Sequence, residues 1–242
     1  MSERAVPYLT AALCVVTGGL SVAPPAFSAA EDSAIAGIWL PDASRSQRFP
    51  SDPPLTAEGK RIVGEWRASH DPIEDDPGKF CQPPGMPSLA LGGADYPVEI
   101  IVTPRQVTIL MELHQQTRRV FLDQPTHPAR PFPQRNGHSI GHWDGDTLVV
   151  DTVAIKAITF GSVPHSDHVH VVERIRALDS GAALVNEVTI TDPVMYTQPV
   201  VVEQYYRAAP EGTRMLEYEC TEGMWIEHEE GRGKRTTLGR TP

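Results

Sequence analysis

From Val98 onward, short apolar runs alternate with small polar turns along the chain. The turns Asp144-Gly145, Asp179-Ser180-Gly181 and Pro210-Glu211-Gly212 separate such runs. An Asp-Gly pair is typical of a tight hairpin because it accepts positive φ. The pattern predicts consecutive antiparallel strands joined as a meander. The expected strands cover residues 37–40, 98–103, 107–113, 118–122, 138–143, 147–151, 169–178, 184–191, 200–207 and 214–220.

One segment ahead of the main series of strands has helical spacing instead. Residues 55–68 place Thr56 as the N-cap, and Ile62, Val63 and Trp66 share the face expected to be buried. The Pro-rich segments on either side predict long irregular loops. The sequence therefore predicts one short helix.

These elements predict an all-β, mainly antiparallel fold. A lipocalin-like meander barrel is favoured because closure removes the exposed strand edges, and a two-sheet β-sandwich is the alternative. We expect an N-terminal strand, the short helix and Pro-rich loops over residues 31–97 to pack on a barrel formed by residues 98–226. Residues 227–242 are charged and are expected to form a disordered tail.

The first 30 residues resemble a secretory signal peptide. Arg4 precedes a mostly apolar run over residues 8–22, and small residues follow at 28–30. Gly18-Gly19 interrupts the run and Pro24-Pro25 follows it, and the run is too short to span a bilayer. The expected location is therefore periplasmic or secreted, with no membrane span in the mature chain.

Cys81 and Cys220 are the cysteines that remain after the predicted signal peptide. Export to an oxidising compartment makes them candidates for a disulfide, and two free buried thiols are the alternative.

The net charge of −10 comes from 31 acidic and 21 basic residues. This balance argues against nucleic acid and anionic membrane surfaces as partners. Small neutral or cationic ligands remain compatible with it.

Residues 164–176 concentrate more titratable chemistry than a structural strand usually carries. With a period of two, His168, His170 and Arg174 share one face, while Glu173 shares the other with valine and isoleucine. A carboxylate on an apolar face either is buried with a partner or lines a cavity.

Two kinds of chemistry fit this segment. Acid–base catalysis would use Glu173 with His165 or His170, and Arg174 would orient the acid or bind an anionic group. Such a site would belong to a cofactor-independent isomerase, cyclase or lyase. A structural Glu-Arg ion pair is the alternative without catalysis.

A zinc or copper site of cupin-like character is the other alternative. His168 and His170 have the spacing of metal ligands on one strand, and His165 would be the third ligand. Arg174 and Arg176 lie beside them and Glu173 lies on the opposite face, which disfavours a metal. We therefore expect no cofactor.

Other polar and aromatic positions are candidates for ligand contact. Ser139 and Trp143 share a strand face with a glycine, Glu112 interrupts an apolar run, and Tyr196 follows a strand. Simple alternation also allows Glu112 to be an ordinary solvent-facing residue.

Several motifs resemble a large, mostly uncharacterised family of secreted bacterial proteins. They are Cys81-Gln-Pro-Pro-Gly-Met-Pro, Tyr96-Pro-Val-Glu, the Gly137–Val150 segment, His165-Ser-Asp-x-x-His-Val-x-Glu-Arg and Tyr196-Thr-x-Pro. The resemblance implies a β-rich exported domain and points to His165, His170, Glu173 and Arg174.

Gly37-Ile38-Trp39 resembles the Gly-x-Trp opening of lipocalins. A barrel of that kind can hold one small ligand inside. The predicted function is therefore an exported barrel that binds a small apolar molecule and possesses acid–base activity. A non-catalytic carrier and a metalloprotein are the alternatives.

Overall fold

The computed structural model describes residues 33–71, 75, 77–91, 96–158 and 163–221. The predicted signal peptide over residues 1–30 and the predicted tail over residues 227–242 lie outside the described residues.

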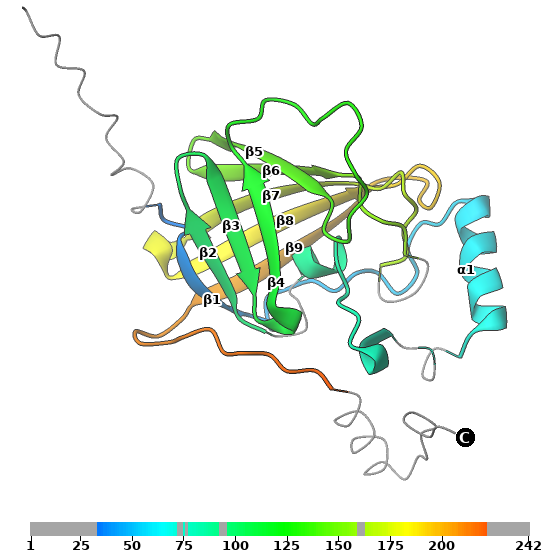
Figure 1. The fold of residues 1–242 in the computed structure, drawn as a ribbon, viewed down its shortest axis with the longest axis horizontal. Helices are drawn as coiled ribbons and strands as arrows, with labels where there is room; N and C mark the ends of the chain where they lie inside the picture. The colour runs from blue at the N-terminus through cyan, green and yellow to red at the C-terminus, as the bar shows by residue number, and fades with distance from the viewer. Residues whose placement is uncertain (1–32, 72–74, 76, 92–95, 159–162, 222–242) are drawn as a thin grey trace, which may run out of the picture.

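Nine strands form one closed barrel, in the order in which they follow along the chain (Figure 1). The closure confirms the predicted lipocalin-like barrel and argues against the two-sheet sandwich. The strands are β1 (Gly37–Pro41), β2 (Val98–Val102), β3 (Gln106–Met111), β4 (Gln116–Phe121), β5 (His138–Asp144), β6 (Thr147–Val153), β7 (His170–Leu178), β8 (Ala183–Thr191) and β9 (Val200–Ala208).

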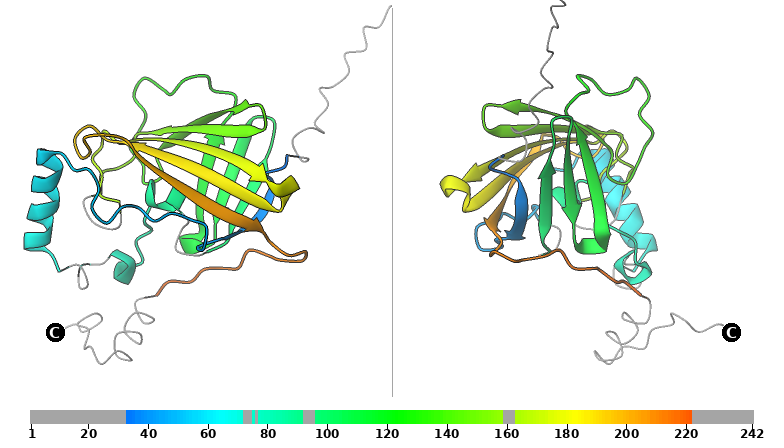
Figure 2. Two further views of the ribbon diagram at one scale, coloured as in Figure 1. Left: turned by 180° about the vertical axis from the view of Figure 1, so that it is seen from behind. Right: turned by 60° about the vertical axis from the view of Figure 1, so that its left-hand side comes forward.

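Antiparallel pairing joins neighbouring strands everywhere except between β4 and β5. Those two strands run parallel and pair only at Val120 with Ser139 and at Phe121 with Ile140. The Pro-rich connection of residues 122–137 carries the chain back along the barrel before β5 begins. It lies outside the wall (Figures 1 and 2).

The strand predicted over residues 214–220 does not form. The place beside β9 is already taken by β1, which pairs with it antiparallel and closes the barrel. The chain instead runs along the outside, where the backbone N–H of Leu216 donates to Glu112 Oε2 at 2.8 Å. Closure left no free edge for another strand.

The predicted helix is present as α1 (Ala57–Ser69), beside one end of the barrel (Figure 2). Thr56 caps it as predicted, because its side chain accepts a hydrogen bond from the Gly59 N–H at 2.8 Å. Val63 is buried, whereas Ile62 and Trp66 are half-buried. The short 3-10 helices are η2 (Pro77–Phe80), η3 (Ser88–Leu91), η5 (Leu113–Gln115) and η6 (Asp179–Gly181).

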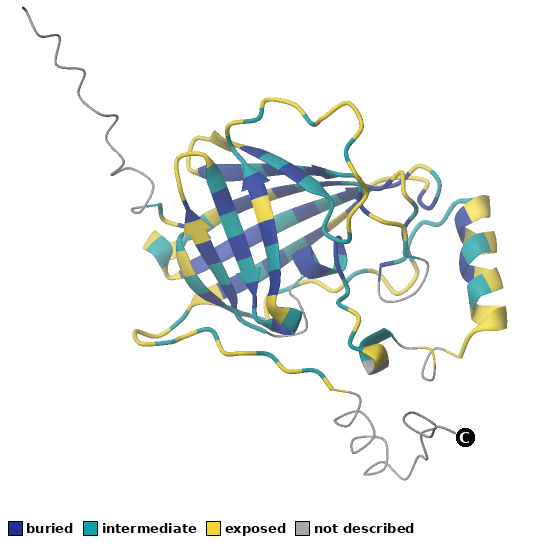
Figure 3. Ribbon diagram, viewed as in Figure 1, coloured by how far each residue is buried: buried dark blue, intermediate teal, exposed yellow. Residues whose placement is uncertain are grey.

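Buried residues alternate with half-buried or exposed ones along most strands, so one face of each strand fills the barrel (Figure 3). The helix η3 contributes Leu89 and Ala90 to this core, and both side chains are buried. They line the interior cavity together with residues of the strands.

Cys81 and Cys220 form a disulfide, as predicted. It joins the segment before η3 to the segment after β9 and is consistent with an oxidising compartment. None of the helices in the described part of the chain has the length and apolar character to cross a membrane.

Candidate functional site

A buried ion pair crosses the inside of the barrel between strands that are not neighbours. Arg118 projects inward from β4 and Glu173 from β7, and their side chains are 2% and 1% exposed. The guanidinium Nη2 donates to Oε2 at 2.6 Å, and Nη1 donates to Oε1 at 3.2 Å. Asn186 on β8 donates from Nδ2 to Oε1 at 2.9 Å. Each buried charge therefore has a geometrically matched partner.

Two hydroxyl groups extend this polar group toward β5. Arg118 Nη2 lies 3.4 Å from Oγ1 of Thr152, and that oxygen lies 2.8 Å from Oγ of Ser139. Both hydroxyl residues are buried. Ser139, a predicted ligand contact, therefore belongs to the polar network inside the wall.

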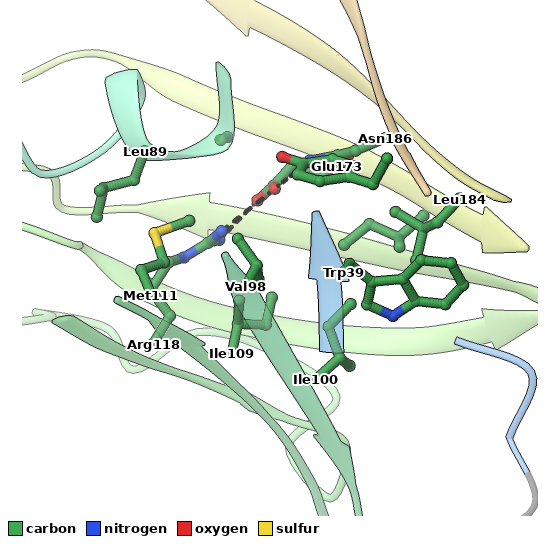
Figure 4. A pocket seen from close by; sticks show the side chains of 13 residues that line it. Trp39, Leu89, Val98, Ile100, Ile109, Met111, Arg118, Glu173, Leu184 and Asn186 are labelled. Carbon is green, nitrogen blue, oxygen red and sulfur yellow. Dashed lines mark hydrogen bonds and ion pairs between the residues drawn. The ribbon is translucent and has the colours of Figure 1, made fainter. Parts of the chain in front are cut away.

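Apolar side chains surround the ion pair and leave a small cavity (Figure 4). The cavity offers about 20 Å³ to the centre of a water-sized sphere, which is room for about one water molecule. Its lining residues are Trp39, Leu89, Ala90, Val98, Ile100, Ile109, Met111, Arg118, Glu173, Ile175, Leu184, Asn186 and Tyr206.

Tyr206 adds a neutral hydroxyl-bearing side chain to this lining. Burial raises its pKa, the neighbouring Glu173 adds to the rise, and Arg118 opposes it. The phenol therefore stays protonated at neutral pH.

Some polar atoms around the ion pair have no hydrogen-bond partner among the described residues. They are Arg118 Nε, Asn186 Oδ1 and both side-chain polar atoms of Gln116. Arg118 and Asn186 line the cavity. Because buried polar atoms are nearly always paired, a water molecule or a ligand is expected to satisfy them.

No protein-family model matches this chain, and no curated protein matches it. The family resemblance drawn from the motifs therefore stays a prediction.

Three solved structures are similar in fold to this chain. A variant of the fluorescent protein UnaG has 18% identity and a TM-score of 0.37, with 74% of this chain and 98% of that chain covered. A secretary abundant heat soluble (SAHS) protein from Ramazzottius varieornatus has 9% identity and a TM-score of 0.39, with 73% and 96% covered. A variant of the REP1-NXSQ fatty acid transporter has 13% identity and a TM-score of 0.36, with 72% and 97% covered. The strand pairing of this chain itself establishes the barrel.

The structure does not assemble the predicted catalytic group. Glu173 faces the cavity, but His170 and Arg174 project from the opposite face of β7. His170 Nε2 lies 2.8 Å from Asp151 Oδ1, and Arg174 Nη2 donates to Asp144 at 2.8 Å. The prediction of the two faces was correct. Strand alternation separates His170 and Arg174 from Glu173, so the structure does not bring this predicted group together.

His165 is buried in the connection between β6 and β7 and does not contact Glu173. Its Nδ1 lies 2.9 Å from the Val163 carbonyl and its Nε2 lies 3.2 Å from the Lys156 carbonyl. Burial lowers its pKa despite those two carbonyls and the nearby Asp192. His165 therefore packs within the loop between β6 and β7 and does not line the barrel cavity.

The alternative metal site is also not brought together. His165 is buried in its loop, His168 is exposed, and His170 contacts Asp151 on the outer face. Within the described residues, no group of three or more His, Cys, Asp or Glu side chains is arranged to hold a metal ion.

A chain of hydrogen bonds on the outer wall was not predicted. His127 lies between His138 and Asp151. Its Nδ1 is 2.8 Å from Nδ1 of His138, and its Nε2 is 3.0 Å from Oδ1 of Asp151. Burial tends to raise the pKa of Asp151, but the hydrogen bonds from His127 and His170 lower it overall. The two ring nitrogens of His127 face different partners. These side chains therefore form a linear chain of hydrogen bonds and do not point toward one common metal position.

The remaining predicted ligand contacts are spread over the molecule. Trp143 is part of a surface pocket at the β5–β6 turn, and Glu112 binds the backbone of Leu216. Tyr196 is buried and donates its hydroxyl to the Pro164 carbonyl. None of these three residues lines the interior cavity.

Arg118 and Asn186 are the interior hydrogen-bond partners of Glu173, and neither was predicted from the sequence. Asn186 lies between Leu184 and Val188 on an apolar face, which is the same signal that revealed Glu173. Arg118 gave no such signal, because Arg119 follows it and either arginine could have faced outward.

Proposed function

We propose that this protein binds a small, mainly apolar molecule inside the barrel, around Arg118, Glu173 and Asn186. The observation that carries the proposal is the pair of unpartnered buried atoms, Arg118 Nε and Asn186 Oδ1, on residues that line a mostly apolar cavity. One is a donor and the other an acceptor. A neutral group such as a hydroxyl can satisfy both kinds of atom.

The internal ion pair makes a neutral ligand preferable to an acidic one. Glu173 already occupies both terminal nitrogens of Arg118. A ligand carboxylate at the free Arg118 Nε would bring a second buried negative charge next to Glu173 with one arginine to balance both, which costs several kcal/mol. The interior therefore favours an uncharged polar group on an apolar body.

The cavity has to enlarge before it accepts more than a water molecule. Leu89 and Ala90 belong to a short 3-10 helix and not to the strand framework. A small shift of η3 would enlarge the cavity without breaking strand pairs. The proposed binding therefore includes displacement of this helix.

Titration with the neutral fluorescent dye 1-naphthol, an apolar molecule with one hydroxyl, tests this function. Ala90→Leu fills the cavity and should weaken dye binding by about tenfold or more. Val201→Phe adds apolar surface on the exposed face of β9 and should leave binding unchanged. Equal binding to both variants, or no saturable binding to the unmodified protein, would overturn the proposal.

Acid–base catalysis by Glu173 alone is the second candidate, because its carboxylate lines the cavity. The test is incubation of a copurified ligand with the protein in D₂O. Incorporation of deuterium that is lost in Glu173→Gln, in a variant whose far-ultraviolet circular dichroism shows that it is folded, would support catalysis. Incorporation that persists in this variant would contradict catalysis by Glu173. A ligand that binds but takes up no deuterium would also contradict it, and would fit a carrier.

A further inference from the structure

A pocket opens in the barrel wall where β4 and β5 meet. The two strands share only the pairs Val120–Ser139 and Phe121–Ile140. Next to these pairs lies a space of about 240 Å³ for the centre of a water-sized sphere, which we name the seam pocket. Its lining residues are Thr117, Arg118, Arg119, Phe121, Gln134, Arg135, Asn136, Gly137, His138 and Ser139.

The seam pocket reaches residues on both faces of the wall. Arg118 and Ser139 are buried on the inner face, whereas Arg119 is exposed on the outer face of β4. Arg118 also lines the interior cavity. The pocket therefore extends from solvent to the residue that holds the internal ion pair.

Positive charge without acidic neighbours distinguishes the seam pocket. Its described lining contains three arginines and no carboxylate, in a chain with a net charge of −10. Among the described residues, Glu173 pairs with Arg118 on the inner side, but Arg119 and Arg135 form no ion pair. Arg135 donates from Nη1 to the Pro83 carbonyl at 2.6 Å, which leaves its other N–H groups for further contacts.

Buried polar atoms at this pocket also lack partners. Asn136 Oδ1 and Arg118 Nε are buried and have no hydrogen-bond partner in the described structure. Arg118 as a whole is 3% exposed. Arg118 Nε is a donor, to which an anion oxygen can be the acceptor, whereas Asn136 Oδ1 is itself an acceptor and needs an O–H, which a hydrogen phosphate supplies.

We propose that the seam pocket binds the oxyanion of a small organic acid, a carboxylate or a phosphate, between Arg119 and Arg135. A guanidinium presents parallel N–H groups that match the oxygens of both anions. This site shares Arg118 with the proposed interior site, and the single N–H of Nε can donate to only one of the two ligands at a time. The site between Arg119 and Arg135 does not require the interior to bind an apolar molecule.

Nuclear magnetic resonance of the full chain, labelled with ¹⁵N, tests the proposal. Hexanoate and inorganic phosphate are titrated separately at constant ionic strength, with hexan-1-ol and chloride as controls. We expect at least one of the two anions to shift the amide signals of Asn136 and Gly137 with saturation, and neither control to do so. Hexanoate alone would assign a carboxylate site, and phosphate alone a phosphate site.

Three variants separate a specific site from general charge attraction. Arg119→Gln and Arg135→Gln should each weaken binding by about tenfold or more. Arg176→Gln removes an exposed arginine on the outer face of β7 and should bind like the unmodified protein. Because Arg119 is exposed, its variant should fold normally, which a far-ultraviolet circular dichroism spectrum checks.

The proposal fails if neither anion gives saturable shifts at the seam. It also fails if chloride gives the same shifts, or if Arg119→Gln and Arg176→Gln bind equally well.

Discussion

Glu173 and Arg118 stabilise each other's charge inside a barrel whose other lining residues are mainly apolar. Both charged side chains are buried, and both terminal nitrogens of the guanidinium donate to the carboxylate. The loss of one partner leaves the other charge buried alone, whereas the loss of both leaves apolar space. The pair therefore has to be tested as a pair.

Glu173→Gln should lower the free energy of unfolding by about 3–5 kcal/mol, because Arg118 keeps its charge and loses its carboxylate. The double variant Arg118→Met/Glu173→Leu should be more stable than Glu173→Gln. Urea unfolding measures both, with Glu187→Gln on the half-buried outer face of β8 as a control that changes little. A Glu173→Gln protein as stable as the control would show that the ion pair is not required.

The pH dependence of stability should come partly from His165. Burial lowers its pKa below the ordinary value of 6.5, so the unfolded chain takes up a proton more readily than the folded chain. The stability from His165 is therefore complete above pH 6.5 and is lost as the pH falls through the lower folded pKa.

His165→Gln should reduce the loss of unfolding free energy between pH 7.5 and pH 5.5. His168→Gln, at an exposed position, should keep the loss seen in the unmodified protein. Urea unfolding at the two pH values makes the comparison. If His165→Gln and His168→Gln showed the same pH dependence, His165 would not be the group responsible.

At the scale of elements, α1 contains two glycines in different surroundings. A Cβ at Gly59 would lie 2.5 Å from the Met195 carbonyl oxygen, whereas a Cβ at Gly64 would have nothing within 4 Å. The close approach of α1 to the β8–β9 connection explains why a glycine occupies position 59.

Gly59→Ala should destabilise the protein by about 1–3 kcal/mol, because backbone atoms must move apart. Gly64→Ala should stabilise it by about 0.5–1 kcal/mol through better helix propensity. The unfolding midpoints in urea should shift in opposite directions. A stabilising Gly59→Ala would contradict the packing of α1 described above.

Most elements could be predicted because they depend on local patterns. Alternation located the strands, and Thr56 located the start of α1. The parallel β4–β5 pair and the failed strand over residues 214–220 depend on where the barrel closes, which local patterns do not contain.

In the barrel as a whole, the candidate site could likewise be predicted where it depends on local pattern, but not where it depends on closure of the barrel. Glu173 was predicted from its place on an apolar face, and Asn186 carried the same signal. Arg118 could not be assigned as the partner, because β4 and β7 face each other only across the closed barrel. His165 and His170 are close to Glu173 in sequence but are separated from it by a loop and by strand alternation.

The disulfide connects distant parts of the chain on the outside of this barrel. Cys81 and Cys220 are 139 residues apart, so the cross-link should restrict the unfolded chain substantially. Cys81→Ser/Cys220→Ser should lose about 2–5 kcal/mol of unfolding free energy. Urea unfolding with and without reductant checks this, and a reduced protein of unchanged stability would contradict it.

Native mass spectrometry of the purified chain tests the central claim, that the barrel interior binds a small molecule. We predict one small molecule per chain, either copurified or taken up from an extract of apolar metabolites. It should be lost in Ala90→Leu and retained in Val201→Phe. A chain that carries and acquires no small molecule, or one whose occupancy is unchanged in Ala90→Leu, would contradict the account.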